Sequence, residues 1–419
     1  MANERRRPQI VIVGAGFGGL EVAHVLARAP AEVVVVDRYN HHTFQPLLYQ
    51  VATAALASPD IAWPIRSILR DQKNARVVMA NVTGVDVDKR LVRAEALEIP
   101  YDYLVLATGV AHSYFGHDEW APVAPGLKTV EDAMDIRRRI LLAFERAELT
   151  DDDAERKRLL TFAIVGGGPT GVEMAGAIAE VARYALRSDF RRIDPSKARI
   201  VLIEAGPRIL PTFPERLSRY ARRSLERMGV EVRTSAMVTE CRKDGASLKD
   251  GRLEASTIIW AAGVAASPAA QWIHAATDKA GRTKVGPDLS VPGHPEIFAI
   301  GDTAVLADPS APPIPGIAPA AKQMGRYVGK LIAGRLAGAK GAAPFLYRHY
   351  LDLAAIGRSS AVVRRGRLQL TGYLAWWFWG IAHIYFLIGV RNRFVVAINW
   401  FWSYLTFQRG ARVITERSA

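Results

Sequence analysis

Two short stretches of the chain have the residue types and spacing that cradle a pyrophosphate. In "VIVGAGFGG", residues 11–19, Gly14, Gly16 and Gly19 follow the spacing G-x-G-x-x-G. The first glycine of this spacing makes a tight turn, the second lets a pyrophosphate approach the backbone, and the third packs a helix on a strand. The next apolar strand, "EVVVVD", ends at Asp37, where a carboxylate accepts hydrogen bonds from a ribose. A site for one dinucleotide is therefore predicted, with the flanking residues Gly18 and Arg38 included.

The same arrangement occurs a second time, in "AIVGGGPTGVE" at residues 163–173. Its glycines are Gly166, Gly168 and Gly171, and the following strand, "RIVLIE", ends at Glu204. A carboxylate at this position suits the ribose 2′-hydroxyl of NAD, and no arginine follows directly to hold the 2′-phosphate of NADP. The sequence therefore favours NAD at the second site, while the nearby Arg208 keeps NADP open.

Three further strands end in turns of small residues. "YDYLVLATG" ends in Thr108 and Gly109, "TIIWAAG" ends in Gly263, and "EIFAIGDTA" contains Gly301 and Asp302. Asp302 has two interpretations: it accepts hydrogen bonds from a polyol such as the ribityl chain of FAD, or it caps a turn or helix. On the residues alone, the cap is favoured.

The elements that must position these motifs are parallel strands and the helices that follow them. "QIVIVGAG" is a β-branched apolar run typical of a fully buried parallel strand, and "LEVAHVLARA" after it has helical periodicity. The second copy repeats this order with the helix "VEMAGAIAEVARYAL". With 419 residues, half of them hydrophobic, the chain is long enough for two or three domains. We therefore predict an α/β fold with two Rossmann-like dinucleotide-binding domains.

Four phrases resemble one family in particular: "FQPLLYQVATAAL" at 44–56, "SYFGHDEW" at 113–120, "GGGPTGVEMAG" at 166–176 and "APAAKQMG" at 318–325. They resemble the type II, non-proton-pumping NADH:quinone oxidoreductases of the two-dinucleotide-binding-domain flavoprotein superfamily. The resemblance implies that the first fold holds FAD and that the second, inserted in the first, holds NADH. The implied domains are an FAD-binding domain at 1–115 and 285–345, an NADH-binding domain at 116–284 and a C-terminal membrane-docking region at 346–419.

The resemblance also implies roles for individual residues. Glu173 matches a glutamate beside the nicotinamide and flavin, although Thr170 three positions earlier also makes a helix capping box. Gln323 matches the glutamine at the quinone pocket, where it would join Glu173 as a catalytic residue. The same pocket is implied to be lined by Pro46, Tyr49 and Ala320.

The single cysteine, Cys241, restricts what can accept the electrons. A mechanism that needs two thiols in one chain is excluded, which leaves a quinone, a redox protein or oxygen. The favoured function is a membrane-associated, FAD-dependent NADH:quinone oxidoreductase that transfers two electrons without pumping protons. The alternatives are an NADH-dependent reductase of a ferredoxin-like protein and an NADH-sensing, membrane-docked flavoprotein.

The C-terminal region has an unusual composition. Leu368–Val390 carries no formal charge and is long enough to cross a bilayer, but the second apolar run, "FVVAINWFWSYLTF", is too short. Tryptophan and tyrosine are spread along both runs, which favours helices lying in the membrane interface. Arg391, Arg393 and the basic end "RGARVITERSA" favour the inner side. The alternative is a hydrophobic hairpin packed on the globular domains or on a second subunit.

The formal charge of +14 suits an anionic partner. We expect this partner to be an anionic membrane surface, because no nucleic-acid-binding motif is present in the sequence. No export signal precedes the first strand, so the expected location is the cytoplasmic face of the cell inner membrane, peripherally bound. The adjacent His41 and His42 have no ligand-spaced partner, so no metal site is predicted. A homodimer is the expected assembly, and the identity of the quinone is left open.

Overall fold

The computed structural model describes residues 6–310, 312–339, 341, 343–406 and 409–414. Residues 1–5, and residues 415–419 of the basic C-terminal end, lie outside the described residues. The chain forms two compact units, the first made of Met1–His42, Trp63–Ala111 and Val264–His349 and the second of Thr43–Ala62, His112–Gly263 and Tyr350–Ala419. The second unit thus contains the second glycine-rich loop together with the segments 43–62 and 350–419. The first unit contains the first glycine-rich loop together with residues 264–284.

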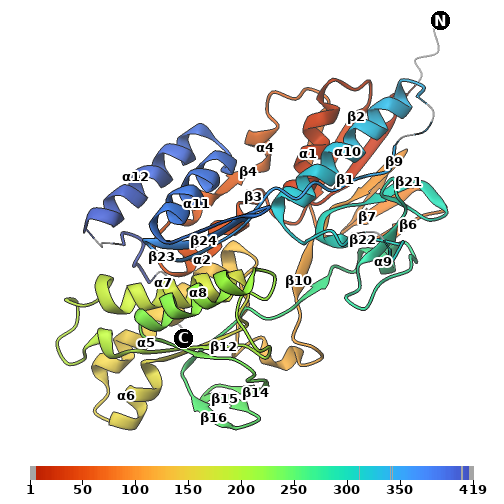
Figure 1. Ribbon diagram of the computed structural model, residues 1–419. Coiled ribbons are helices and arrows are strands. Elements are labelled where there is room, and N and C mark those ends of the chain that lie inside the picture. The colour runs from red at the N-terminus through yellow and green to blue at the C-terminus, as the bar shows by residue number, and fades with distance from the viewer. Residues whose placement is uncertain (1–5, 311, 340, 342, 407–408, 415–419) are drawn as a thin grey trace, which may run out of the picture. The chain divides into compact units, whose positions relative to one another are not determined.

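The first unit is built on a six-stranded sheet with the order β20-β21-β9-β1-β2-β5 (Figure 1). Its strands are β1 (Gln9–Val13), β2 (Glu32–Asp37), β5 (Ala75–Met79), β9 (Tyr103–Leu106), β20 (Ser290–Val291) and β21 (His294–Ala299), all parallel except for β20. β1 is buried from Ile10 to Val13, as its β-branched run predicts. This burial fixes the glycine-rich loop at the carboxyl edge of the sheet.

Helices α1 (Phe17–Val25) and α10 (Ala318–Leu336) pack against each other in the first unit. Glycines make this close packing possible, because a Cβ at Gly325 would lie 2.3 Å from the carbonyl oxygen of Gly18. The start of α10 is thereby held close to the first glycine-rich loop. The other elements of this unit are α4 (Ile65–Ile68), α9 (Ala269–Trp272), β6 (Val82–Asp86), β7 (Leu91–Ala94), β8 (Leu97–Pro100), β19 (Thr283–Val285) and β22 (Ala304–Leu306).

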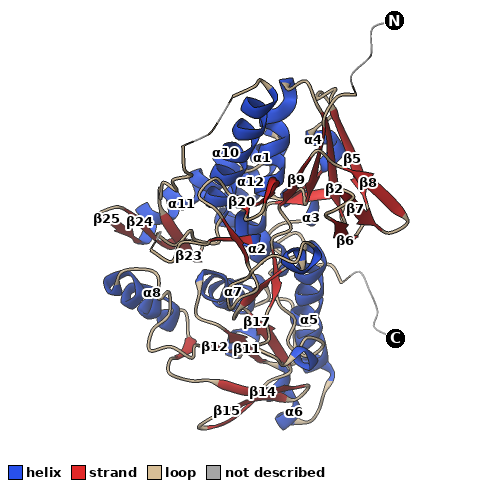
Figure 2. Cartoon of the chain, turned by 90° about the vertical axis from the view of Figure 1, so that its right-hand side faces the viewer, coloured by secondary structure: helices blue, strands red, loops and turns tan. Residues whose placement is uncertain are grey.

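The second unit repeats the architecture with a four-stranded parallel sheet in the order β13-β12-β11-β17. Its strands are β11 (Thr161–Val165), β12 (Arg199–Ile203), β13 (Val230–Arg233) and β17 (Thr257–Trp260). Three helices pack on this sheet (Figure 2): α5 (Val130–Leu149), α7 (Pro169–Glu180) and α8 (Glu215–Arg227). The α/β fold with two dinucleotide-binding folds is therefore confirmed. Smaller elements are α2 (Leu48–Ala52), α3 (Ser58–Ile61), α6 (Asp153–Leu159), β14 (Val238–Arg242), β15 (Gly245–Leu248) and β16 (Gly251–Glu254).

Short strands form where the chain passes from one unit into the other. They are β3 (His41–Thr43), β4 (Ala62–Pro64), β10 (Val110–His112) and β18 (Val264–Ala266). β3 pairs with β4 and β10 with β18, so each crossing consists of two hydrogen-bonded strands.

The C-terminal region of the second unit is an antiparallel sheet followed by two helices. The sheet consists of β23 (Asp352–Gly357), β24 (Ser360–Arg365) and β25 (Leu368–Thr371). β23 contacts α7, while β24 contacts both α8 and α11 (Gly372–Phe386); α12 (Val390–Thr406) follows (Figure 1). The first apolar run is therefore divided into a strand and a helix, and Gly372, at φ +73°, is the first residue of the helix.

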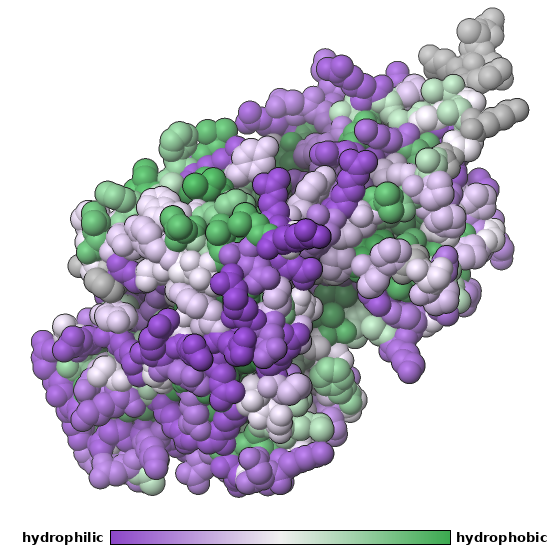
Figure 3. Space-filling view, viewed as in Figure 1, coloured by the Kyte–Doolittle hydropathy of each residue, from purple (hydrophilic) through white to green (hydrophobic). Residues whose placement is uncertain are grey.

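Both C-terminal helices expose large hydrophobic side chains. Trp377, Ile381 and Tyr385 recur at helical spacing on α11, and Phe394, Ile398 and Trp402 do so on α12. Ile381 and Ile398 are 64% and 63% exposed. Figure 3 shows hydrophobic side chains gathered over these helices at the upper left. Within the described part of the chain, no helix is both long enough and apolar enough to span a bilayer.

Candidate active site

The first glycine-rich loop has a geometry that requires its glycines. Gly14 has φ +101°, and a Cβ there would lie 2.4 Å from the carbonyl oxygen of Ala107. A Cβ at Gly19 would lie 1.9 Å from the carbonyl oxygen of Gly14, so this glycine lets α1 begin directly against the loop. A Cβ at Gly16, at the N-cap of α1, would meet nothing within 4 Å. The loop therefore leaves room for a pyrophosphate at the start of the helix, where backbone N–H groups favour an anion.

The second loop repeats this geometry within its own unit. Gly166 has φ +110°, and a Cβ there would lie 2.7 Å from the carbonyl oxygen of Ala261. A Cβ at Gly171 would lie 1.8 Å from the carbonyl oxygen of Gly166, whereas one at Gly168 would meet nothing within 4 Å. Both glycine motifs of the sequence thus form loops of the same geometry, each with room for a pyrophosphate.

The two strand-end acids also occupy equivalent positions. Asp37 accepts hydrogen bonds from the N–H groups of Ala15, at 2.6 Å, and Tyr39, at 2.8 Å. Glu204 accepts from the N–H groups of Gly167 and Gly206, both at 2.6 Å. Each carboxylate oxygen has a second lone pair, which can accept from a ribose hydroxyl. Each acid therefore fixes its loop and remains suited to bind a dinucleotide ribose.

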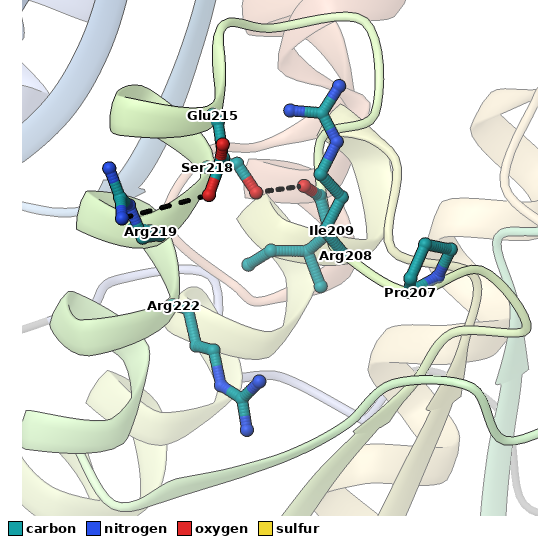
Figure 4. Close-up of a pocket in the computed structure, with 7 residues that line it drawn as sticks. All are labelled: Pro207, Arg208, Ile209, Glu215, Ser218, Arg219 and Arg222. Atoms are coloured by element: carbon teal, nitrogen blue, oxygen red, sulfur yellow. Dashed lines mark hydrogen bonds and ion pairs between the residues drawn. The ribbon is translucent and has the colours of Figure 1, made fainter.

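Arg208, the residue that kept NADP open, does not turn toward Glu204. Its guanidinium donates to the carbonyl oxygens of Phe213, at 3.1 Å, and Pro211, at 2.8 Å. Figure 4 shows that the guanidinium groups of Arg208, Arg219 and Arg222 diverge around a pocket of about 300 Å³. They form no convergent site for a 2′-phosphate, which agrees with the preference for NAD.

Hydroxyl groups from three strand ends meet in the first unit. The Thr108 Oγ1 lies 2.5 Å from the Ser267 Oγ and 3.2 Å from the Thr303 Oγ1, which accepts a hydrogen bond from the Gly109 N–H at 2.8 Å. Thr108 and Gly109 were predicted as cofactor-binding residues, whereas Ser267 and Thr303 were not. Their proximity is a tertiary feature, because the three segments lie far apart in the sequence.

Asp302 and the start of α10 lie against the same turn. A Cβ at Gly316 would lie 3.2 Å from an Asp302 carboxylate oxygen, and a Cβ at Gly301 would lie 3.3 Å from the Ala321 Cβ. The predicted pocket residue Ala320 is buried beside them. Gly301 and Gly316 therefore let these segments approach closely, and the N-terminus of α10, which favours negative charge, lies against the turn that carries Asp302.

Gln323 is half-buried on α10, and its amide is engaged within the first unit. Its Nε2 donates to the carbonyl oxygen of Arg348 at 2.9 Å, and its Oε1 accepts from the Arg348 N–H at 3.0 Å. One amide proton remains to donate to a ligand. The geometry therefore permits Gln323 to donate a hydrogen bond to a quinone, and this contact stays a prediction.

Glu173 forms no capping box. Helix α7 begins at Pro169 with Gly168 as its N-cap, so Thr170 lies inside the helix and no side chain caps it. The Glu173 Oε1 instead accepts a hydrogen bond from the N–H of Ala355 on β23, at 3.2 Å. Burial raises the pKa of the Glu173 carboxyl to about 8, although part of the side chain reaches the surface. Near neutral pH this carboxyl is mostly protonated and able to donate a proton.

Tyr49 lies in the same unit as Glu173, on α2, and Pro46 lies in the turn before it. Burial and the charge of Glu173 raise the pKa of the Tyr49 hydroxyl well above its ordinary value, so the hydroxyl stays protonated. The Tyr49 oxygen accepts a hydrogen bond from the Gln50 Nε2 at 3.1 Å. Pro46 and Tyr49 belong to the second unit, and Ala320 and Gln323 belong to the first.

A buried ion pair joins the C-terminal end of the chain to these elements. Arg409 donates to the Glu180 Oε2 at 2.9 Å and to the carbonyl oxygen of Thr53, at the end of α2, at 2.7 Å. The N–H of Arg358 donates to the other Glu180 oxygen at 2.5 Å. Arg409 and Glu180 were missed in the sequence, where the only signal was a basic residue directly after an apolar run.

The adjacent histidines have separate roles in the structure. The His42 Nδ1 lies 2.9 Å from the carbonyl oxygen of Ala15, in the first glycine-rich loop, and burial lowers the pKa of His42 to about 4. The His41 Nδ1 lies 2.9 Å from the Asn40 Oδ1. His42 therefore supports the loop as a neutral side chain. Across the described ranges, no group of three or more His, Cys, Asp or Glu side chains is arranged to hold a metal ion.

Comparison with known proteins identifies relatives over the whole chain. Residues 8–325 match the family model described as pyridine nucleotide-disulphide oxidoreductase. The chain is similar to two proteins of Mycobacterium tuberculosis named type II NADH:quinone oxidoreductase. Ndh is 42% identical over 100% of this chain and 92% of its own length. NdhA is 43% identical over 98% of this chain and 90% of its own length. The fold matches the structure of NDH2 from Plasmodium falciparum in complex with NADH, with TM-score 0.87 and 20% identity over 98% of this chain and 100% of that one.

Proposed function

The chain belongs to the type II NADH:quinone oxidoreductases of the pyridine nucleotide-disulphide oxidoreductase family, and we propose that it oxidises NADH and reduces a quinone through bound FAD. The observation that carries this function is the pair of dinucleotide cradles with equivalent strand-end acids, in a chain similar over its full length to enzymes of that name. No proton pumping accompanies the reaction.

The residues of the first unit fit FAD. Its pyrophosphate would be held by Gly14, Gly16 and Gly19, with Gly18 beside them. Asp37 would bind its ribose, and Asp302 would bind its ribityl chain. The adjoining turns are lined by Arg38, Thr108, Gly109 and Gly301. When bound, the flavin accepts a hydride and passes two electrons on. The N-terminus of α10 would stabilise the negative charge of the reduced ring.

The residues of the second unit fit NADH. Gly166, Gly168 and Gly171 would hold the pyrophosphate and Glu204 the ribose 2′-hydroxyl. Gly263, at φ +82°, lies at the end of the strand behind this loop, and a Cβ there would lie 2.5 Å from the Phe115 ring. This close approach explains why a small residue is needed at that turn.

Thiol chemistry has no place in this mechanism, despite the family's name. Cys241 is the one cysteine of the sequence, and burial raises the pKa of its thiol to about 12. A buried, protonated thiol is not a nucleophile. Quinone reduction instead requires a proton donor, for which Glu173 is suited, and polar groups that orient the quinone, for which Tyr49 and Gln323 are the candidates.

The exposed faces of α11 and α12 support peripheral docking on a membrane. Large apolar side chains on one face of each helix bury area in the acyl boundary, and Lys and Arg gain about 1 kcal/mol each near an anionic surface. We place the protein on the cytoplasmic side because Arg391, Arg393 and the basic C-terminal end favour the inner side of a membrane, and we propose a homodimer as its assembly. Light scattering of the detergent-solubilised protein measures the assembly, and a monomer would contradict the homodimer.

The function is tested with purified protein. The absorption spectrum should show bound flavin that NADH bleaches, and NADH oxidation should depend on an added short-chain quinone. NADH oxidation that requires a ferredoxin-like protein would support the reductase alternative. Flavin that NADH bleaches without turnover on any acceptor would support the sensor.

A further inference from the structure

A hydrogen-bonded chain of side chains runs from the C-terminal helix α12 to Tyr49 on α2. The indole Nε1 of Trp400 donates to the Gln50 Oε1 at 2.7 Å, and the Gln50 Nε2 donates to the Tyr49 hydroxyl oxygen at 3.1 Å. Tyr49 and Gln50 are buried, at 7% and 8% exposure, and all three residues belong to the second unit. The chain therefore connects the exposed apolar helices to the predicted quinone residue.

The direction of these hydrogen bonds is fixed by chemistry. An indole nitrogen only donates, so the Gln50 atom that faces Trp400 must be the oxygen. The Gln50 amide must then present its NH₂ group to Tyr49, whose oxygen accepts. As a result, the hydroxyl proton of Tyr49 points away from Gln50. The Tyr49 proton has no acceptor among the side chains that the structure describes.

The position of α12 against this segment is set by two further contacts. The Asn392 Nδ2 donates to the carbonyl oxygen of Pro59 at 3.2 Å, and the Asn399 Nδ2 donates to the Asp60 Oδ2 at 3.4 Å. These bonds lie along one side of α12, while Phe394, Ile398 and Trp402 are exposed. These contacts of α12 thus position the Trp400 indole to donate to the Gln50 Oε1.

We propose that Trp400 and Gln50 are positioning residues for quinone reduction, which orient the Tyr49 hydroxyl so that it donates a hydrogen bond to a quinone oxygen. This inference rests on the proposed function. Trp400 and Gln50 do not themselves touch the quinone, and their contribution passes through Tyr49. The membrane-facing helix α12 thereby determines the geometry of the quinone site.

Trp379 provides a matched control. It stacks on Trp400 with a ring-centroid distance of 5.2 Å and is 1% exposed, but its Nε1 has no hydrogen-bond partner among the described residues. Trp379→Phe and Trp400→Phe remove the same atoms from the same aromatic stack. Only Trp400→Phe removes a hydrogen bond to Gln50.

The experiment compares Trp400→Phe, Trp379→Phe, Tyr49→Phe and the double variant Tyr49→Phe/Trp400→Phe, each as full-length holoenzyme. Trp400→Phe should lower kcat/KM for a short-chain quinone about threefold to tenfold, as expected for one lost hydrogen bond, while NADH bleaches the flavin at the wild-type rate. Trp379→Phe should keep the wild-type kcat/KM. In the Tyr49→Phe background, Trp400→Phe should have no further effect, because the hydroxyl that it orients is gone.

Three results would overturn the inference: equal losses in Trp400→Phe and Trp379→Phe, wild-type kinetics in Trp400→Phe, or an undiminished effect of Trp400→Phe in the Tyr49→Phe background. The first and third would assign Trp400 to packing alone. A wild-type enzyme that NADH reduces but no quinone reoxidises would instead contradict the proposed function. The two failures are therefore distinguishable.

Discussion

Replacing Glu173 by Gln should remove a pH dependence from quinone reduction. In the structure, burial raises the pKa of this carboxyl to about 8, and the hydrogen bond from the Ala355 N–H opposes this shift. The protonated form is the one that can donate a proton. Quinone reduction by the wild type should therefore be fast below pH 8 and fall as the pH rises through 8.

The size of this effect follows from the pKa. A group with a pKa of about 8 is roughly nine-tenths protonated at pH 7 and roughly one-tenth protonated at pH 9. The wild-type rate should thus fall about tenfold over this interval. Glutamine keeps the size and the hydrogen bond to Ala355 but does not titrate, so Glu173→Gln should be slower at pH 7 and nearly flat from pH 7 to 9.

Stopped-flow absorbance separates the two halves of the reaction. One trace follows flavin bleaching by NADH, and the other follows reoxidation of the reduced enzyme by a short-chain quinone, each from pH 6 to 9. Glu204 and Asp37 keep their contacts in the Glu173 variant, so cofactor content should be unchanged. A wild-type reoxidation rate that is flat through pH 8, or a variant that keeps the same fall, would refute the role of Glu173 as a proton donor.

Four further predictions follow from the site and its supports. Glu204→Arg should weaken the preference for NADH over NADPH, measured as the ratio of kcat/KM values, and a wild type equally active with both would contradict the assignment. Gln323→Ala should slow reoxidation by quinone more than flavin reduction, so equal slowing of both would remove Gln323 from the quinone site. Ile381→Ser combined with Ile398→Ser should weaken binding to anionic liposomes, whereas Leu149→Ser on α5, a control at a still more exposed position, should not. High salt should release the wild type only partly. Arg409→Met should lower the unfolding free energy by about 3–5 kcal/mol, because it leaves Glu180 buried without its cation. Adding Glu180→Gln to this variant should recover part of the loss. A thermal denaturation midpoint unchanged from wild type in Arg409→Met would contradict the role of the pair.

The C-terminal region is tested with point substitutions, and not with a truncation, for a structural reason. Trp400 and Arg409 are hydrogen-bonded into the second unit, to Gln50 and Glu180. A truncation before α11 would remove these contacts together with the exposed apolar face. Loss of activity after truncation would then say little about the membrane, whereas substitutions at Ile381 and Ile398 leave the buried contacts in place.

The sequence by itself determined the two dinucleotide folds. Gly14 and Gly166 are needed because their backbone is left-handed, and Asp37 and Glu204 bind their loops across 22 and 37 residues of chain. Such constraints are local, so they leave a fixed spacing in the sequence. The single cysteine likewise excluded a two-thiol mechanism by composition alone.

Only the tertiary structure decided the environment of Glu173, Glu180 and Gln50. Glu173 meets Ala355 across 182 residues of chain, Glu180 meets Arg409 across 229, and Gln50 meets Trp400 across 350. The spacing T-x-x-E of Thr170 and Glu173 indicated a capping box, but the helix begins at Pro169 and the carboxyl turns to β23 instead. Contacts between residues so far apart leave no fixed spacing in the sequence, because they depend on how β23 packs against α7 and α12 against α2. The same packing buries Glu173, which shifts its pKa, and supplies the hydrogen-bond donors that orient the Tyr49 hydroxyl.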